Sequence, residues 1–260
     1  MRFRPCIDIH NGKVKQIVGG SLRDAGSAAK ENFVAEQDAA FYAEFYKRDG
    51  RRGGHVILLN PAGSDYYEAT KAQAALALSA YPGGLQLGGG VNAENAEAFL
   101  EMGASHVIVT SYVFKDGRLQ EKNLEKMIHA VGKERLVLDL SCRKKDGQYR
   151  IVTDRWQKYT ELPVNEAVLK QLSGSCSEFL IHAVDVEGKA SGVDRELLEV
   201  LGGFTEIPVT YAGGVSGFSD LELVRILGRN HVDVTIGSAL DLFGGPMAYR
   251  KVLDFIGQTE

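Results

Sequence analysis

The chain has 260 residues, of which 44% are hydrophobic and 25% charged, a composition typical of a globular protein. The net charge of −4 argues against a general nucleic-acid binder, and the three cysteines form neither a disulfide framework nor a pattern with metal-ligand spacing. Because we find no signal-peptide pattern and no apolar run of ~20 residues, we expect a cytoplasmic protein without a membrane span.

Short runs typical of buried strands alternate with helical patterns along the whole chain. Asn92 and Ser219 are the expected N-caps of two helices, which we expect to stop at Gly103 and Gly228. We expect strands within residues 3–9, 55–60, 85–89, 106–110, 135–141, 178–184, 207–213 and 232–238, and helices within 35–50, 92–103, 217–228 and 245–257.

Eight strand–helix pairs in a chain of this length predict a single-domain α/β fold, a (β/α)8 (TIM) barrel. An open doubly wound sheet is the alternative, and we disfavour it because no G-x-G-x-x-G motif follows the first strand.

The sequence also contains an internal repeat. Residues 87–111 and 212–238 both read strand, Gly-Gly-Val, helix, Gly and then His-Val-x-Val-Thr. This repeat predicts two half-barrels, approximately 1–130 and 131–260.

Two aspartates lie within the apolar runs that we expect to be strands 1 and 5. Side-chain alternation places Asp8 on the same strand face as Cys6 and His10, and Asp139 on the same face as Ser141. In an eight-stranded barrel, strands 1 and 5 face each other across the axis, so both carboxylates would reach the mouth. One such Asp alone would more often be structural, but the opposed pair favours division of acid and base roles. The near symmetry does not show which aspartate is the acid.

Glycine-rich stretches follow strands 3, 4, 7 and 8 in both halves of the repeat. Glycines allow backbone N–H groups to approach an anion, and a helix N-terminus adds positive potential. A single Gly-Gly pair is a weak signal because tight turns also need glycine. The doubled pattern predicts two phosphate sites that face each other across the mouth.

The roles of the aromatic and imidazole side chains stay open at this point. In the loop after strand 5, the Asp146-Gly147 step predicts a hairpin turn. Trp156, the only tryptophan, follows it and could cover a helix or stack on a flat ligand. His10 and His182, near strand ends, could equally be structural or touch substrate. We expect His55, His106 and His231 to be structural because they start strands, at the opposite end of the barrel.

These motifs together resemble the phosphoribosylformimino-5-aminoimidazole carboxamide ribotide isomerases of histidine biosynthesis, in particular the eukaryotic branch. The resemblance spans nearly the whole chain and rests on "PCIDIHNGKVKQIVGG", "LQLGGGVN", "LVLDLS", "HAVDVEG", "TYAGGVSG" and "IGSAL". It implies a cofactor-free Amadori rearrangement of an aminoaldose to an aminoketose, on a small substrate with a phosphate at each end. No metal, nucleic acid or membrane is implied, and we expect a monomer.

The resemblance also implies residue roles. Asp8 matches the general base and Asp139 the general acid, while Trp156 matches a tryptophan that stacks on the substrate. The expected substrate- and phosphate-binding positions are Gly90, Ser111, Trp156, His182, Gly214, Gly237 and Ser238.

Three positions depart from the bacterial pattern of these isomerases. His182 stands where a threonine is common, Glu187 where an aspartate is, and Asn92 where an arginine often occurs. Two other functions stay open: the related cyclase of the same pathway, which needs an ammonia supply, and a non-catalytic barrel that binds a phosphorylated metabolite.

Overall fold

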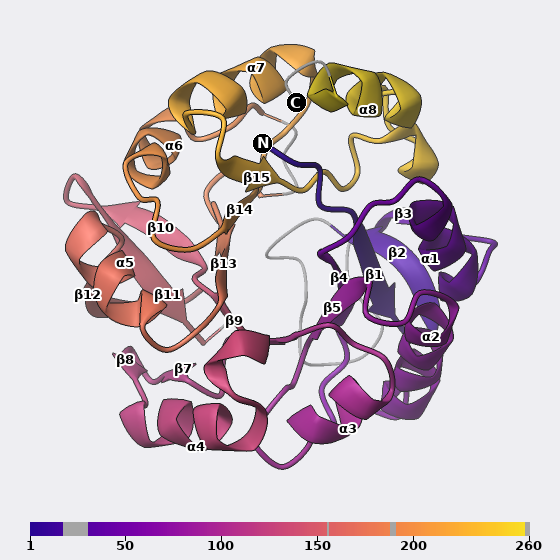
Figure 1. Cartoon of the computed structure of the whole chain (residues 1–260), viewed down its shortest axis with the longest axis horizontal. Helices are drawn as coiled ribbons and strands as arrows, with labels where there is room; N and C mark the ends of the chain where they lie inside the picture. The colour runs from indigo at the N-terminus through magenta and orange to yellow at the C-terminus, as the bar shows by residue number, and fades with distance from the viewer. Residues whose placement is uncertain (18–30, 155, 188–190, 258–260) are drawn as a thin grey trace.

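Parallel strands form the inner ring of the structure, a computed structural model that describes residues 1–17, 31–154, 156–187 and 191–257. Figure 1 looks down the ring, and each strand pairs in parallel with the next along the chain. The strands are β1 (Cys6–His10), β4 (Gly54–Leu58), β5 (Leu85–Gly88), β6 (Val107–Val109), β9 (Leu136–Asp139), β13 (Glu178–His182), β14 (Val209–Ala212) and β15 (Val232–Val234). All eight coincide with a predicted range, and only β1 at His10 and β4 at Gly54 extend one residue beyond it.

The residues before β1 close the ring against β15. Phe3 forms a parallel bridge with Val234, and the backbone N–H of Arg4 donates to the carbonyl oxygen of Val234 at 2.8 Å. Closure joins the two strands that would otherwise be edges. The predicted (β/α)8 barrel is therefore confirmed.

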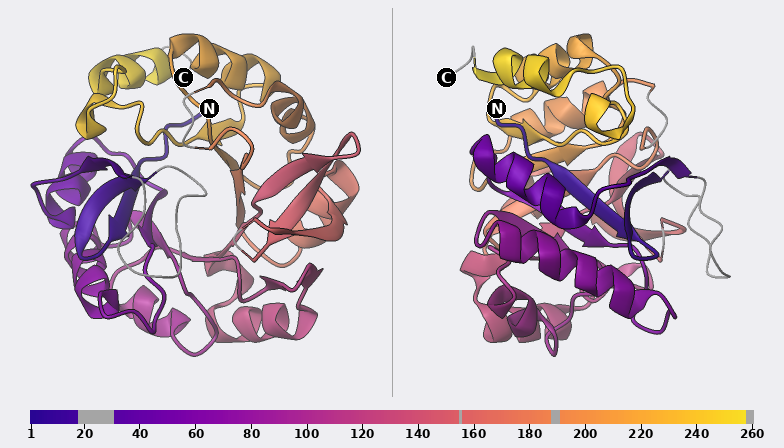
Figure 2. Two further views of the ribbon diagram at one scale, coloured as in Figure 1. Left: turned by 180° about the vertical axis from the view of Figure 1, so that it is seen from behind. Right: turned by 90° about the vertical axis from the view of Figure 1, so that its right-hand side faces the viewer.

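Helices surround the strands in an outer layer, seen from behind in the left view of Figure 2. They are α1 (Ala39–Arg48), α2 (Tyr67–Ala80), α3 (Ala96–Glu101), α4 (Glu121–Val131), α5 (Glu166–Ser173), α6 (Arg195–Gly202), α7 (Phe218–Leu227) and α8 (Tyr249–Gly257), with the short 3₁₀ helices η1 (Lys133–Arg135) and η2 (Asp241–Phe243). Within the described ranges, no helix combines the length and apolar character that a bilayer span requires.

Neither predicted residue is the N-cap of its helix, and the N-cap of α3 is Asn95. The Asn92 side chain accepts from the backbone N–H groups of Glu94 and Asn95, in the turn that leads into α3. Ser219 was the wrong residue for α7, because the helix has already begun at Phe218 with Gly217 as its cap. There the Asp220 carboxylate accepts from the Gly217 N–H, so a side chain inside the first turn satisfies the helix start.

Three small groups of antiparallel strands follow the barrel strands β1, β6 and β9. The predicted Asp146-Gly147 turn is present, with positive φ at both residues (51° and 78°), as a two-residue hairpin turn requires. The other strands of these groups were not predicted. The strands are β2 (Lys13–Ile17) with β3 (Glu31–Val34), β7 (Phe114–Lys115) with β8 (Arg118–Leu119), and β10 (Cys142–Lys145), β11 (Gln148–Thr153) and β12 (Lys158–Pro163).

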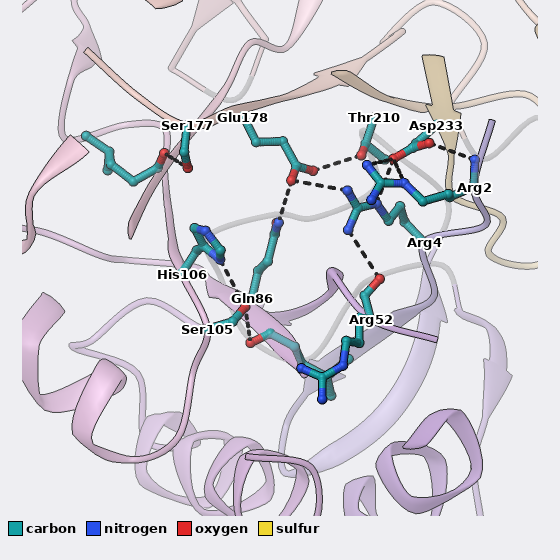
Figure 3. Close-up of polar contacts among 12 residues, drawn as sticks. Arg2, Arg4, Arg52, Gln86, Ser105, His106, Ser177, Glu178, Thr210 and Asp233 are labelled. Carbon is teal, nitrogen blue, oxygen red and sulfur yellow. Dashed lines mark hydrogen bonds and ion pairs between the residues drawn. The ribbon is translucent and has the colours of Figure 1, made fainter. Parts of the chain in front are cut away.

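The interior of the barrel changes character along its axis. At the amino-terminal end of the strands, Figure 3 shows Arg4, Gln86, Glu178, Thr210 and Asp233 pointing toward one another. Arg4 Nε lies 2.9 Å from Asp233 Oδ2, and Glu178 accepts from Gln86 Nε2 at 3.0 Å and from Thr210 Oγ1 at 2.9 Å. Each buried charge in this layer has hydrogen-bonding or ionic partners. We call these five residues the polar floor of the barrel.

Above this floor lies a small apolar layer formed by Ile108, Val137, Leu180 and Ala212, one from each of four strands. The main core lies outside the ring, where residues such as Ile7 and Ile9 are fully buried. Alternation along β1 therefore turns Cys6 and Asp8 inward, as predicted.

The sequence repeat has a counterpart in the backbone. Gly89 and Gly90 after β5 have φ of 98° and 69°, and Gly213 and Gly214 after β14 have φ of 125° and 73°. The half-barrels at approximately 1–130 and 131–260 remain a prediction, and their proposed boundary falls near the end of α4.

Candidate active site

One cavity of about 260 Å³ lies inside the barrel and extends to the carboxyl ends of the strands. Side chains from opposite sides of the ring line it, among them both predicted aspartates. The lining residues are Cys6, Asp8, Gln16, His55, Ile57, Leu59, Thr110, Asp139, Ser141, Trp156, His182, Glu187, Ala212, Gly213, Gly214, Val215, Thr235, Ile236, Gly237 and Ser238.

Asp8 reaches the cavity from the middle of β1, and within the described ranges its side chain accepts one hydrogen bond. The Gln16 side-chain amide on β2 donates to Asp8 Oδ2 at 3.1 Å. Burial, together with the negative charge of Glu187, raises the pKa of Asp8 to about 7, against the opposing effects of His182 and Gln16. A carboxyl with a pKa near neutrality can both take up and release a proton under physiological conditions.

Asp139, at the end of β9, has a different environment. Thr110 Oγ1 lies 3.2 Å from Asp139 Oδ2, while Ser141 Oγ lies 3.3 Å from Oδ1. His182 Nδ1, from the adjacent strand β13, lies 2.9 Å from the same Oδ1. The two aspartates that the repeat relates therefore differ in their partners: one faces an amide, the other an imidazole and two hydroxyls.

Titratable groups are concentrated around His182. Burial alone would lower the pKa of this imidazole, but the carboxylates of Asp139, Glu187 and Asp8 raise it to about 9. Burial also raises the pKa of Glu187. The cavity thus holds three carboxyl groups beside one imidazole that favours its cationic form.

His55 lies at the start of β4, as predicted, and its side chain also lines the cavity, which was not predicted. It pairs with Cys6 in the β1–β4 register, and paired residues of neighbouring strands point to the same side. Burial, together with the charge of His182, lowers the pKa of His55 to about 3. This imidazole is therefore neutral.

The other histidines have contacts away from the cavity. His231 Nε2 lies 3.1 Å from the carbonyl oxygen of Phe204, and His106 Nδ1 lies 3.1 Å from Ser105 Oγ. His10 is buried at the end of β1 and is not among the cavity residues.

The predicted phosphate residues divide into two groups. Gly214, Gly237 and Ser238, after β14 and β15, line the cavity. Gly90 and Ser111 lie in the loops after β5 and β6, at the same end of the barrel, but are not among its lining residues. The structure therefore places one predicted pair of loops in the cavity lining, whereas the other pair lies outside that lining.

Two glycines beside the cavity have close neighbours at the position where a side chain would begin. A Cβ at Gly214 would lie 2.1 Å from the carbonyl oxygen of Gly192, at a φ of 73°. A Cβ at Gly237 would lie 2.3 Å from Gln16 Oε1, the side chain that contacts Asp8. The backbone of these loops is thus held close to the site.

Trp156 lines the cavity from the loop between β11 and β12. Its φ of 68° lies in the left-handed region, which is strained for a bulky side chain. Such strain is concentrated at functional sites, where the surroundings impose it. This favours the ligand-contact interpretation of Trp156 over simple cover for a helix.

Sequence reasoning missed Gln16 as a partner of Asp8 and did not assign Thr110 a role. Thr110 directly follows β6, so its position at a strand end was a usable signal. Gln16 had no such signal, because the strand that carries it was not predicted. Within the described ranges, we find no group of three or more His, Cys, Asp or Glu side chains that could hold a metal ion.

The sequence of the chain matches those of a known protein family. Residues 2–245 match the family model described as "Histidine biosynthesis protein". A chloroplastic protein of Medicago truncatula is 54% identical, over all of this chain and 83% of that protein. A protein of Yarrowia lipolytica is 48% identical and one of Saccharomyces cerevisiae 43% identical, each over 94% of this chain and 93% of the relative.

All three relatives bear the name 1-(5-phosphoribosyl)-5-((5-phosphoribosylamino)methylideneamino)imidazole-4-carboxamide isomerase. The family match covers most of the chain, and the relatives align along nearly its full length. The chain therefore belongs to the histidine biosynthesis protein family.

Proposed function

We propose that this chain is the isomerase for which its relatives are named, and that it converts their bisphosphorylated aminoaldose to the aminoketose. The observation that carries the proposal is the pair of carboxylates, Asp8 and Asp139, which line one cavity from different sides of the barrel. Their unequal surroundings support unequal proton-transfer roles.

An Amadori rearrangement needs an acid and a base in turn. An acid protonates the ribose ring oxygen, the C1–O bond breaks, and the nitrogen lone pair forms a C1=N bond. A base then removes the C2 proton, which gives an enol that becomes the ketone. We assign the base to Asp8, whose pKa of about 7 lets it accept this proton, and the acid to Asp139.

The two ends of the substrate would bind at opposite sides of the mouth. We propose that Gly214, Gly237 and Ser238 hold one phosphate and that Gly90 and Ser111 hold the other. Support comes from the matching positive φ values after β5 and β14, because such loops expose backbone N–H groups. We further propose that Trp156 stacks on the flat part of the substrate and that no cofactor takes part.

Several wider expectations stay predictions. The monomeric state and the lack of nucleic-acid and membrane partners follow only from the composition and the sequence resemblance. A cytoplasmic location is likewise a prediction, and the Medicago truncatula relative is named as chloroplastic.

The test is to incubate the purified chain with the aminoaldose in the absence of ammonia and to follow the products by NMR. Conversion to the aminoketose is expected. In a second incubation with added ammonia, substrate consumption that depends on the ammonia would favour the cyclase instead. Tight binding without conversion would favour a non-catalytic barrel.

A further inference from the structure

The contact between His182 and Asp139 has no role in a mechanism that uses two aspartates alone. The two residues come from neighbouring parallel strands, where Leu180 pairs with Asp139, so His182 stands two residues further along β13. Its Nδ1 lies 2.9 Å from Asp139 Oδ1, and both side chains line the cavity. About 19% of the His182 side chain and 12% of the Asp139 side chain are exposed, so both are accessible from the cavity.

The hydrogen bonds around Asp139 indicate where the proton of this pair resides. Thr110 Oγ1 can donate to one carboxyl oxygen, and Ser141 Oγ and His182 Nδ1 can donate to the other. An ionised carboxylate only accepts hydrogen bonds, and three donors favour that form. The donor arrangement therefore places the proton on the imidazole.

The charges that face His182 from the surrounding elements agree with this placement. Asp139 on β9, Asp8 on β1 and Glu187 after β13 are carboxyl groups, whereas His55 on β4 is neutral. Their combined effect outweighs burial and raises the pKa of His182 to about 9. Hence the imidazole is cationic at neutral pH.

We infer that His182 is a positioning residue that stores the proton for the acid half of the reaction and supplies it through Asp139. This inference rests on the function proposed above. It replaces a binding role for His182, and it explains how Asp139 can act as an acid although its donors favour the ionised form. Among the described residues, Asp8 accepts its hydrogen bond from the Gln16 amide and not from an imidazole, so the two halves of the repeat differ in this respect.

The proton balance closes over one turnover. The His182 proton moves to Asp139, and Asp139 protonates the ring oxygen as the C1–O bond breaks. Asp8 takes the C2 proton and returns a proton to C1. The enol hydroxyl loses its proton to the Asp139–His182 pair as the C2=O bond forms. The substrate gains two protons and loses two, and no other reactant is needed.

The charge state of His182 can be measured directly on the wild-type chain by NMR of its imidazole nitrogens, assigned by loss of the signal in His182→Asn. We expect both nitrogens to be protonated at neutral pH and to titrate near the pKa of about 9. A neutral ring at neutral pH would overturn the inference. This measurement needs no substrate, so it stands even if the proposed function fails.

The His182→Asn variant separates proton storage from simple hydrogen bonding. An asparagine amide can stand near the position of Nδ1 and donate to Asp139, but it cannot carry the exchangeable charge. We expect kcat at about pH 8 to fall on the order of 10²-fold, the usual contribution of a positioned acid or base. The alkaline limb of kcat/KM should move to lower pH by at least about one unit, because an imidazolium no longer supplies the proton.

The acidic limb of the same variant should move to higher pH, because the His182 charge that lowers the pKa of Asp8 is gone. The profile thus narrows from both sides. Circular dichroism shows whether the variant is folded. A folded His182→Asn variant with an unchanged alkaline limb would overturn the inference. Absence of conversion by the wild-type chain at every pH would instead refute the proposed function.

Discussion

Replacement of Gln16 by leucine should move the acidic limb of the pH–rate profile. Gln16 is the side-chain donor to Asp8, at 3.1 Å, and it is buried beside the cavity. Leucine keeps the approximate volume but removes the donor. The ionised form of Asp8 then loses stabilisation, so its pKa rises further above about 7.

The size of the shift follows from the energy of a hydrogen bond to a charged group. Such a bond contributes about 1.5–3 kcal/mol, which corresponds to roughly 1–2 pH units at about 1.4 kcal/mol per unit. Because the cavity is open to solvent, we expect the lower value, a shift of about one unit. Well below the limb, kcat/KM should fall about tenfold, and at about pH 8.5 it should lie within about twofold of the wild-type value.

The assay is kcat/KM for the aminoaldose across the pH range, with Gln171→Leu as the matched control. Gln171 is exposed on α5, away from the cavity, so its replacement should leave the profile unchanged. An acidic limb that does not move in Gln16→Leu would refute the assignment of Asp8 as the base. An equal loss at every pH would show that Gln16 acts on substrate binding instead.

Three further predictions concern stability and binding. The raised pKa of Asp8 contributes stability that is fully present below the pKa of this group in the unfolded chain and is lost as pH rises through about 7. Asp8→Asn should therefore raise the free energy of unfolding more at about pH 8 than at about pH 5, by up to ~3 kcal/mol in urea titrations. An equal effect at both pH values contradicts this. Arg4→Met removes the cation that contacts two buried carboxylates, Glu178 and Asp233, of which Asp233 keeps Arg2, and should cost about 3–5 kcal/mol in the same assay. The exposed Lys158→Met should leave the free energy of unfolding nearly unchanged, and similar losses in the two variants would contradict the floor's role. Gly214→Ala should raise KM more than Gly83→Ala, because both have positive φ but only the first places a methyl group against a carbonyl oxygen; equal KM values would contradict the close approach.

Much of the barrel could be predicted from the sequence because its strands are short apolar runs with separate helix signals between them. The run around Asp139 is an example: Leu136 and Leu138 face the helices while Val137 and Asp139 face inward. The antiparallel strands β2, β3, β7, β8 and β12 were missed because they are short and rich in polar residues, so their hydrophobic pattern is weak.

The candidate site was predicted less completely, for a physical reason. Asp8 and Asp139 could be identified because a carboxylate within an apolar strand is costly unless it has a function. The Gln16 and His182 contacts depend on which strands are neighbours and how their side chains meet, which a single sequence does not specify. That His55 also lines the cavity could not be predicted for the same reason, since only the register with Cys6 shows that it points into the barrel.

The most direct test of the proposed mechanism is turnover of the aminoaldose by Asp8→Asn and Asp139→Asn, followed by NMR in heavy water beside the wild-type chain. Each replacement keeps the side-chain shape but removes the ability to exchange a proton. We predict that the wild-type chain forms the aminoketose, whereas each folded variant binds the substrate and leaves it unchanged. Turnover near the wild-type rate in either variant would contradict the two-aspartate mechanism.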